Sequence, residues 1–457
     1  MRFFYLDRPI DEREEKKFGK VNNHSQLSYA GSNFQDLILK SLNANLKFKK
    51  IFSIEELDKS EHAIIWSSNI IFQDLKFQKL YLRKLQAVSF EFFAGDKDSF
   101  IFKGRTKDLN KFLADYPVSL SQSSTIHCPL EKHLFQVKEF IDYQYLLSLA
   151  PQSRTFNDVY IRHDWVQKKS SNIQKIKGEY SFLVNIPSSL KEYFPSVKNF
   201  YHEKAIAGYE VEFIDGLDLG VRYLNQSIDI KLFQKISAIL KMYFHKAKLI
   251  QPYKKIKQDP HTFIIEKNLI RFEMTKKLPY FDLLNTFVKH HTIFHDYDDL
   301  SSTLNNNLIK NQKKINKAGL IFSHGDLCFS NMILSDNDFK LSLIDPRGGE
   351  EAFLSPYYDF AKLSHSVLGG YDFIVSNKAQ IVFDDSMQAR IELGFDPVTY
   401  LPAFNLLAEE FNLEIQLIRL VEASLFLSMI PLHMENSKRV IMMGLRSSEI
   451  MKDFLES

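Results

Sequence analysis

The chain has 457 residues, of which 45% are hydrophobic and 25% are charged; 59 Lys and Arg against 56 Asp and Glu leave a net charge of +3. This is the mixture of a globular protein, and it excludes a disordered or collagen-like chain. The near-neutral balance argues against a nucleic-acid partner, because dedicated nucleic-acid binders carry a strongly basic face.

Three features predict a cytoplasmic protein without an integral membrane segment. The two cysteines, Cys128 and Cys328, are too far apart in sequence for a disulfide framework or for zinc-ligand spacing. The N-terminal residues lack an apolar core long enough for a signal peptide. The longest apolar stretch, 417–432, contains Arg419 and Glu422, so we expect a buried helix there.

Residues 1–150 are predicted to form one α/β domain. Apolar residues recur with helical spacing over 33–42, and 62–69 has the pattern of a buried strand that leads into a polar turn. A helix is predicted over 72–88, and another is predicted to end at the Pro151 domain boundary. The turn after the strand has no glycine-rich phosphate fingerprint, so it implies no cofactor.

The next segment, up to residue 218, is rich in predicted strands. Residues 159–161 and 165–169 flank a short polar turn, which predicts a β-hairpin. One face of 172–187 is apolar with helical spacing, and 208–216 alternates like a strand and ends at glycine. From residue 218 onward the pattern is mainly helical, with long loops.

The segment LIFSHGDLCFSNMILSDNDFKLSLIDPRGG, residues 320–349, carries the chemistry. A short strand turns at Gly325 into an irregular loop that holds Asp326 and Asn331. Two further strands follow as a hairpin, and the second ends at Asp345, so the three polar side chains are expected to converge. Mg²⁺ prefers such oxygen ligands together with phosphates, and a second carboxylate can orient or deprotonate an attacking hydroxyl.

HGDLCFSN resembles the H-G-D-x-x-x-x-N loop of the aminoglycoside phosphotransferase and choline kinase family, which has a protein-kinase-like fold. LIDPRG resembles the family's magnesium-binding strand, and YYDFAKL resembles the start of its following helix. The resemblance implies that Asp326 is the catalytic base and that Asn331 and Asp345 bind Mg²⁺. It also implies that Asp359 braces the loop and that His324 orients it and is not the base.

The same resemblance implies a bilobal α+β domain, with an N-lobe over 151–218 and a helical C-lobe over 219–457. Such a fold places a strand lysine on the nucleotide phosphates and pairs it with a helix glutamate, here Glu179. Two lysines are candidates. Alternation along the strand favours Lys168, whereas the family's small residue directly after the lysine favours Lys169.

Two other parts of the site are assigned by resemblance. YEVEFIDG resembles the hinge that lines the adenine pocket, and its contact residues would be Val211, Glu212, Phe213 and Ile214. Arg347 follows the magnesium-binding aspartate, where it either contacts phosphate or pins the loop. The expected function is an ATP- and Mg²⁺-dependent kinase whose acceptor is a hydroxyl of a sugar, polyol or amino alcohol.

Several segments, among them RTFN, IDPRG and SLFLSMIPLH, resemble a branch of bacterial surface-polysaccharide proteins in which a nucleotidyltransferase-like unit precedes the kinase-like domain. This resemblance implies a role in capsule or other polysaccharide biosynthesis, with proteins of that process as partners. Asn69 stands where such N-terminal units carry a metal-binding aspartate, which predicts a degenerate nucleotidyltransferase- or glycosyltransferase-like domain.

Two alternative functions follow from the same features. The segment SRTFNDVYI lacks the glycine-rich loop of the protein kinases, which is compatible with a pseudokinase or a nucleotide-binding scaffold in a polysaccharide biosynthesis complex. Alternatively, residues 1–150 carry a nucleotidyltransferase or glycosyltransferase activity, although Asn69 argues against it.

Overall fold

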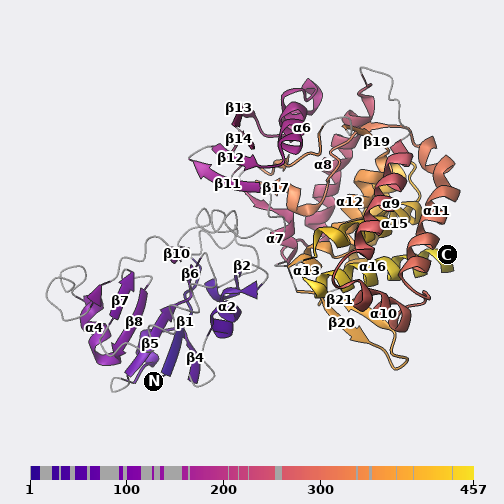
Figure 1. The fold of residues 1–457 in the computed structure, drawn as a ribbon. Coiled ribbons are helices and arrows are strands. Elements are labelled where there is room, and N and C mark those ends of the chain that lie inside the picture. The colour runs from indigo at the N-terminus through magenta and orange to yellow at the C-terminus, as the bar shows by residue number, and fades with distance from the viewer. Residues whose placement is uncertain are drawn as a thin grey trace. The chain divides into compact units, whose positions relative to one another are not determined.

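The chain divides into two compact units, Met1–Gln152 and Ser153–Ser457, in the computed structural model (Figure 1). The structure describes residues 2–10, 23–29, 32–41, 47–58, 62–72, 92–95, 100–114, 126–127, 134–137, 157–162, 165–203, 205–214, 216–224, 226–252, 260–335, 338–348, 352–376, 378–394, 396–434 and 436–457. The predicted boundary at Pro151 and the helix predicted to end there lie outside these residues.

The first unit is built on a mixed sheet with the strand order β4-β1-β5-β8-β7-β9. β1 pairs in parallel with β4 and β5, whereas β8 runs antiparallel to β5 and β7. The central strands are almost entirely buried, which accounts for continuous apolar runs such as RFFYL in β1. The six strands are β1 (Arg2–Leu6), β4 (Lys47–Ile51), β5 (His62–Ser67), β7 (Phe92–Gly95), β8 (Phe100–Arg105) and β9 (Ile126–His127).

Beside two 3-10 turns, at His24–Gln26 and Ile54–Glu56, the described residues of this unit form two helices and four further short strands. They are α2 (Phe34–Ser41), α4 (Thr106–Ala114), β2 (Ser28–Tyr29), β3 (Ser32–Asn33), β6 (Ile70–Phe72) and β10 (Leu134–Gln136). The helix predicted over 33–42 and the strand predicted over 62–69 are confirmed as α2 and β5. The helix predicted over 72–88 falls outside the described residues except for Phe72, which belongs to β6. Asn69 follows β5 and is buried.

The second unit begins with an antiparallel four-stranded sheet of order β11-β12-β14-β13. Its strands are β11 (Asn157–Arg162), β12 (Trp165–Ser170), β13 (Val197–Glu203) and β14 (Ile206–Glu212), and β11 and β12 form the predicted hairpin. Helix α6 (Ile173–Val184) packs against β13 and β14. The Asn172 side chain caps α6 by accepting a hydrogen bond from the Lys175 backbone N–H.

The strand predicted over 208–216 corresponds to β14, which ends at Glu212, four residues earlier than predicted. Glu212 pairs with Trp165, the first residue of β12, so no partner in that strand continues the ladder beyond it. Of the four predicted hinge residues, Val211 and Glu212 therefore lie in β14, and Phe213 and Ile214 follow it.

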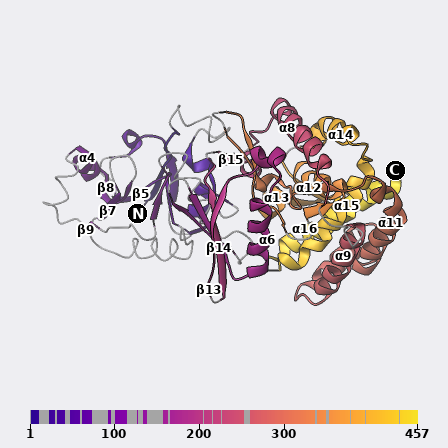
Figure 2. The same ribbon diagram turned by 90° about the horizontal axis from the view of Figure 1, so that it is seen from above.

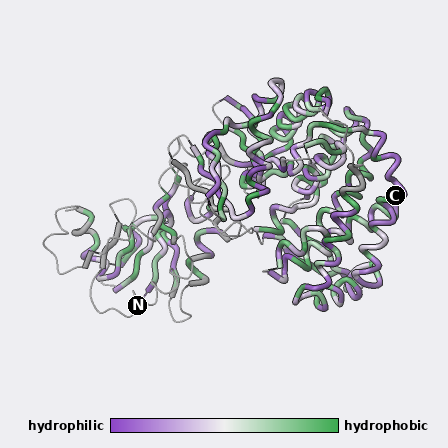
Figure 3. Tube along the Cα trace, turned by 45° about the horizontal axis from the view of Figure 1, so that its top comes forward, coloured by the Kyte–Doolittle hydropathy of each residue, from purple (hydrophilic) through white to green (hydrophobic). Residues whose placement is uncertain are grey.

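The rest of the second unit is mainly helical, as predicted. Its helices are α7 (Leu219–Leu224), α8 (Ile230–Leu249), α9 (Pro260–Lys276), α10 (Phe281–His291), α11 (Tyr297–Lys317), α12 (Pro356–Val367), α13 (Tyr371–Val375), α14 (Leu401–Glu410), α15 (Ile415–Met429) and α16 (Ser437–Glu456). Hydrophobic and hydrophilic stretches alternate along many of these helices (Figure 3), as expected where one face is buried.

Helix α15 is largely buried, with contacts to α12 on one side and α16 on another (Figures 1 and 2). With the turn that follows it, α15 forms the stretch Ile415–Leu432, which is long and apolar enough by composition to cross a bilayer. In the structure 78% of this stretch is buried inside the unit. The predicted buried helix is therefore confirmed.

Short strands among the helices position the loop of interest. They are β15 (Leu217–Asp218), β16 (Ile321–Phe322), β17 (Met332–Leu334), β18 (Leu341–Leu343) and β19 (Phe353–Leu354); a separate hairpin is formed by β20 (Gln380–Phe383) and β21 (Ala389–Glu392). β17 and β18 form the predicted antiparallel hairpin, with Met332 opposite Leu343. The hairpin therefore returns the chain to the loop that precedes β17.

Candidate functional site

A chain of three charged side chains links the sheet, α6 and the end of the β17–β18 hairpin. The Lys168 Nζ atom lies 2.7 Å from Glu179 Oε2 and 2.8 Å from Asp345 Oδ1. The Lys168 and Glu179 side chains are only 4% and 2% exposed, whereas that of Asp345 is 41% exposed. The Tyr209 hydroxyl, which lies opposite Lys168 on β14, also donates to Glu179 Oε2. Asp345 is thus partly exposed to solvent, while its Oδ1 atom is paired with the buried Lys168.

These contacts settle the protonation of the pair. Burial opposes the charged form of Lys168, but the Asp345 carboxylate and the other neighbouring groups outweigh it and raise the pKa of Lys168 well above its usual value. Burial likewise opposes ionisation of Asp345, yet Lys168 lowers the pKa of that carboxyl. Both groups are therefore charged at neutral pH.

Of the two lysines left open by the sequence, Lys168 is the one that contacts Glu179 and Asp345. Lys169 is the next residue of β12, and successive side chains of a strand point to opposite faces of the sheet. Alternation with Val166 was therefore the better guide to this geometry than the small residue after Lys169.

The loop after β16 is held in a tight turn by Gly325. This residue has a φ of +76°, and a Cβ atom built there would lie 2.7 Å from the Cβ of Arg347. The Asn331 side-chain NH₂ donates to the Asp326 backbone oxygen at 2.8 Å, which spans the loop from end to end. The Asn331 side-chain oxygen, which is the atom that a metal would bind, takes no part in this hydrogen bond.

Backbone hydrogen bonds join this loop to the segment that follows β18. The Ile344 N–H donates to Asn331 O at 2.9 Å, and the Arg347 N–H donates to His324 O at 2.8 Å. The intervening Asp345 has a φ of +57°, a left-handed conformation that is uncommon outside glycine and that aspartate and asparagine tolerate best. Asp326, Asn331 and Asp345 are thus brought together, as their spacing predicted.

Asp359, near the start of α12, accepts two backbone N–H groups of the loop. Its Oδ2 binds the His324 N–H and its Oδ1 binds the Gly325 N–H, both at 2.8 Å. Asp359 is fully buried, and burial raises the pKa of its carboxyl above the usual value. Asp359 therefore holds the backbone of the loop in place, which is the role that the family resemblance implies for it.

His324 is fully buried and hydrogen-bonded at both ring nitrogens. Nε2 lies 2.9 Å from Ile344 O, and Nδ1 lies 3.3 Å from the Asp326 backbone N. Since a carbonyl only accepts and an N–H only donates, Nε2 carries the proton and Nδ1 accepts. Burial lowers the pKa of His324, so the ring is neutral and both of its nitrogens are engaged within the loop. The contacts orient the loop.

Arg347 lies toward α12. Its Nη1 donates to the Tyr358 hydroxyl at 2.8 Å, and the Lys267 Nζ atom of α9 donates to the same oxygen at 2.8 Å. Together with its backbone bond to His324, this contact makes Arg347 a tether between the loop and α12. The sequence left phosphate contact and loop pinning open for Arg347, and the structure shows the pinning contacts.

Sequence reasoning missed Lys362, one turn of α12 after Asp359. Its Nζ atom lies 2.9 Å from Asp326 Oδ1, and its side chain is only 5% exposed. The signal was present in YYDFAKL, because residues three apart on a helix share one face. A lysine three positions after a loop-bracing aspartate points to the same loop.

The four predicted hinge residues lie at the end of β14 and just beyond it, and all are half-buried. Val211 pairs with Val166 of β12, two residues before Lys168. The chain then passes through β15 into α7, the first helix of the helical part. The hinge region is therefore the covalent connection between the sheet and the helices.

A magnesium ion fits the donor set at the loop. Mg²⁺ is usually bound in proteins by one or two oxygen side chains and completed by phosphate and water oxygens, and Asp345 and Asn331 offer a carboxylate and an amide. No group of three or more His, Cys, Asp or Glu side chains suited to a metal is found within the described ranges. Two protein ligands of this kind would leave the remaining positions of the ion to phosphate and water oxygens.

Two acidic residues lie behind the loop, Asp218 in β15 and Asp372 in α13. Desolvation by burial raises the pKa of Asp218 to about 7, although its hydrogen bond from the Val221 N–H opposes the change; the nearby charge of Asp372 adds to it. Burial raises the pKa of Asp372 to about 6. Folding therefore retains protons that the unfolded chain loses near pH 4.

We expect the contribution of Asp218 and Asp372 to the free energy of unfolding to fall as the pH rises from about 4 to 7, because these two groups bind more protons in the native state than in the unfolded state in this window. Asp218→Asn keeps a cap for Val221 and removes the charge. Relative to the wild type it should gain about 1 to 3 kcal/mol between pH 4 and pH 8, on the scale of ~1.4 kcal/mol per pH unit. Urea unfolding at both pH values measures this, and an equal difference at the two would contradict it.

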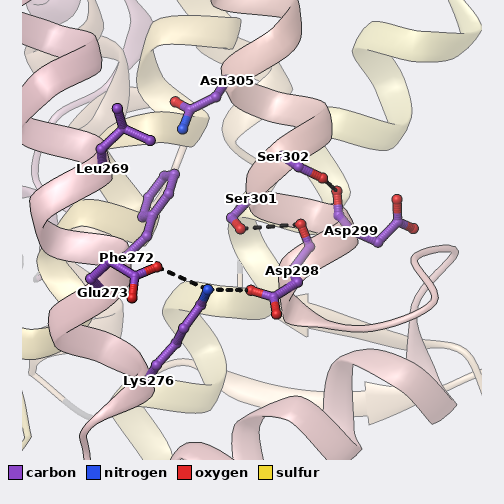
Figure 4. Close-up of a pocket in the computed structure, with 9 residues that line it drawn as sticks. All are labelled: Leu269, Phe272, Glu273, Lys276, Asp298, Asp299, Ser301, Ser302 and Asn305. Carbon is purple, nitrogen blue, oxygen red and sulfur yellow. Dashed lines mark hydrogen bonds and ion pairs between the residues drawn. The ribbon is translucent and has the colours of Figure 1, made fainter.

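A separate pocket of about 420 Å³ lies between α9 and α11 (Figure 4). Its wall includes the ion pairs from Lys276 to Glu273 and Asp298. The lining residues are Leu269, Phe272, Glu273, Lys276, Asp298, Asp299, Ser301, Ser302 and Asn305. None of them is among the predicted site residues.

No protein-family model and no curated protein matches this sequence. Solved structures similar to it include aminoglycoside phosphotransferases and a choline kinase. Aminoglycoside 2'-phosphotransferase-IIIa in complex with GDP is 13% identical, with a TM-score of 0.41, over 66% of this chain and 88% of that one. A mutant of aminoglycoside phosphotransferase APH(4)-Ia with AMP-PNP and hygromycin B is 10% identical, with a TM-score of 0.44, over 65% and 90%.

Choline kinase from Cryptosporidium parvum is 10% identical, with a TM-score of 0.35, over 66% of this chain and 86% of that one. These proteins are of the two kinds named from the HGDLCFSN motif. Because the identities are low and the TM-scores lie below 0.5, the functional proposal rests on the side chains of the site.

Proposed function

We propose that this chain is an ATP- and Mg²⁺-dependent phosphotransferase that acts on a hydroxyl of a small molecule. The observation that carries the proposal is the chain of contacts from Glu179 through Lys168 to Asp345, which ends beside the loop of Asp326 and Asn331. A phosphate-binding cation, two metal-binding oxygens and a carboxylate for the acceptor are the parts that phosphoryl transfer requires.

Each residue has a defined role in this reaction. Lys168, held by Glu179, binds nucleotide phosphates, and Asp345 and Asn331 hold Mg²⁺, which neutralises phosphate charge when bound. Asp326 accepts the proton of the acceptor hydroxyl while the hydroxyl oxygen forms its bond to the γ-phosphorus. The bond from that phosphorus to the bridging oxygen breaks, and ADP leaves. Positioning and electrostatic stabilisation supply most of the rate enhancement.

The direct test is a screen of sugars, polyols and amino alcohols with ATP and Mg²⁺. ADP release that depends on one of these acceptors, with a phosphorylated product found by mass spectrometry, supports the proposal. Nucleotide binding without turnover on any acceptor or water would favour the pseudokinase alternative.

We further propose that the acceptor belongs to capsule or other surface-polysaccharide biosynthesis in the cytoplasm. Support comes from the resemblance of RTFN, IDPRG and SLFLSMIPLH to that branch of the family. Turnover of amino alcohols in preference to sugars and polyols would contradict this proposal and leave the kinase proposal intact.

The first unit is proposed to be a degenerate nucleotidyltransferase- or glycosyltransferase-like domain without catalytic activity. Asn69 lies after β5 where an enzyme of that kind would carry a metal-binding carboxylate, and an amide binds a divalent cation more weakly. Sugar-nucleotide turnover by the full chain that survives Asp345→Asn would revive activity in residues 1–150.

A fragment of residues 153–457 is expected to fold and to bind Mg-ATP with the affinity of the full chain. Every residue proposed to contact the nucleotide lies in this unit, which has its own continuous hydrophobic core. Calorimetric titration of both proteins with ATP and Mg²⁺ measures this. A folded fragment that fails to bind would show that the first unit completes the site.

A further inference from the structure

Helix α12 holds the loop of Asp326 at three points along one face. Asp359 accepts the His324 and Gly325 N–H groups, Lys362 contacts the Asp326 carboxylate, and the Ser366 Oγ atom accepts the Phe329 N–H at 3.0 Å. The three residues are spaced at i, i+3 and i+7, which places them on a single side of a helix. One face of α12 therefore supports the loop along its length.

Lys362 differs from the other two residues in what it binds. Asp359 and Ser366 bind backbone N–H groups and so set the path of the loop, whereas Lys362 binds a side-chain oxygen, Oδ1 of Asp326, at 2.9 Å. The Lys362 side chain is 5% exposed and that of Asp326 is 18% exposed. An ammonium that is almost fully buried stays in place only with a charged partner.

We propose that Lys362 is a positioning residue that fixes the rotamer of the Asp326 carboxylate for the acceptor hydroxyl. This inference rests on the proposed function. One carboxylate oxygen is anchored from α12, so the carboxylate cannot rotate freely about its Cα–Cβ and Cβ–Cγ bonds. A base that must meet a hydroxyl within hydrogen-bond reach gains from such restraint, because a misplacement of 1 Å can cost about 10²-fold in rate.

Lys362→Met removes the charge and keeps the length of the side chain. We expect the kcat of ATP turnover, with water as acceptor, to fall by about 10- to 10²-fold. The KM for ATP should stay unchanged, since the proposed nucleotide contacts belong to Lys168 and Asp345. Lys362→Arg, which keeps a positive charge, should recover most of the turnover.

A double-mutant cycle with Asp326→Asn separates positioning from a general structural role. If Lys362 acts through the Asp326 carboxylate, Lys362→Met has little further effect once that carboxylate is gone; a structural role lowers kcat equally in both backgrounds. Lys314→Met is the matched control, because Lys314 on α11 forms an exposed ion pair with Glu414, which directly precedes α15, and such pairs contribute little.

Three results have distinct meanings. Wild-type turnover by Lys362→Met, with Asp326→Asn inactive, overturns this inference and leaves the proposed function standing. Equal losses in both backgrounds also overturn it. Undiminished turnover by Asp326→Asn contradicts the proposed function itself. Should Lys362→Met unfold, Lys362→Gln replaces it in the cycle, because glutamine keeps a hydrogen-bond donor without the charge.

Discussion

Asp345→Asn is expected to reduce Mg-ATP turnover by on the order of 10³-fold, because a metal ion contributes several kcal/mol of transition-state stabilisation. Asparagine tolerates the left-handed backbone of Asp345, with its φ of +57°, better than alanine does, so the substitution tests charge and not strain. The side chain is 41% exposed and lies outside the core, so the fold should be retained.

The measurement for Asp345→Asn is ADP release at increasing Mg²⁺ concentration, with thermal unfolding as the check on the fold. Half-saturation should move to higher Mg²⁺ in the variant. The matched control is Asp338→Asn, an exposed aspartate of the β17–β18 turn, which should behave like the wild type. A folded Asp345→Asn protein with unchanged turnover and Mg²⁺ dependence would remove the centre of the kinase proposal.

Asp326→Asn should leave nucleotide affinity nearly unchanged and lower turnover by a factor on the order of 10² to 10⁴, which is the usual contribution of a positioned base. Asparagine has nearly the size of aspartate but cannot take up the proton of the acceptor. The remaining nucleotide contacts at Lys168 and Asp345 stay in place.

Two assays of Asp326→Asn, ATP binding by calorimetry and turnover by ADP release, distinguish the candidate functions. In a phosphotransferase only the second changes. In a pseudokinase neither changes, since the wild type has no turnover to lose. Loss of ATP binding with the fold preserved would move Asp326 to the nucleotide side of the site.

The sequence predicted the parts of the site that depend on local order. Strand alternation around Lys168, the turn at Gly325 and the hairpin that returns Asp345 are consequences of short-range patterns, and the structure has them. The convergence of the loop with α12 depends on a contact between residues some 35 positions apart. Resemblance to a motif tied Asp359 to the loop, and the contact of Lys362 with Asp326 could have been inferred from there only by its helical spacing from Asp359.

Other departures have physical causes that a single sequence does not carry. β14 stops at Glu212 because β12 begins opposite it at Trp165, and pairing partners are set by tertiary structure. Arg347 donates to the Tyr358 hydroxyl, and Lys267 of α9 donates to the same oxygen. The local sequence around Arg347 or Lys267 does not indicate this shared acceptor.

Gly348, three residues after Asp345, packs closely against the main chain of α6. A Cβ atom on Gly348, whose φ is +59°, would lie 2.1 Å from the Gly178 carbonyl oxygen, directly before Glu179. The three atoms nearest to that position all belong to the α6 main chain, so a side-chain rotamer change there cannot relieve the clash of an added methyl group. Any larger residue at position 348 would wedge α6 away and lengthen the contacts among Glu179, Lys168 and Asp345. The distance between the proposed phosphate-binding Lys168 and the proposed metal-binding Asp345 therefore depends on having glycine, which has no side chain, at position 348.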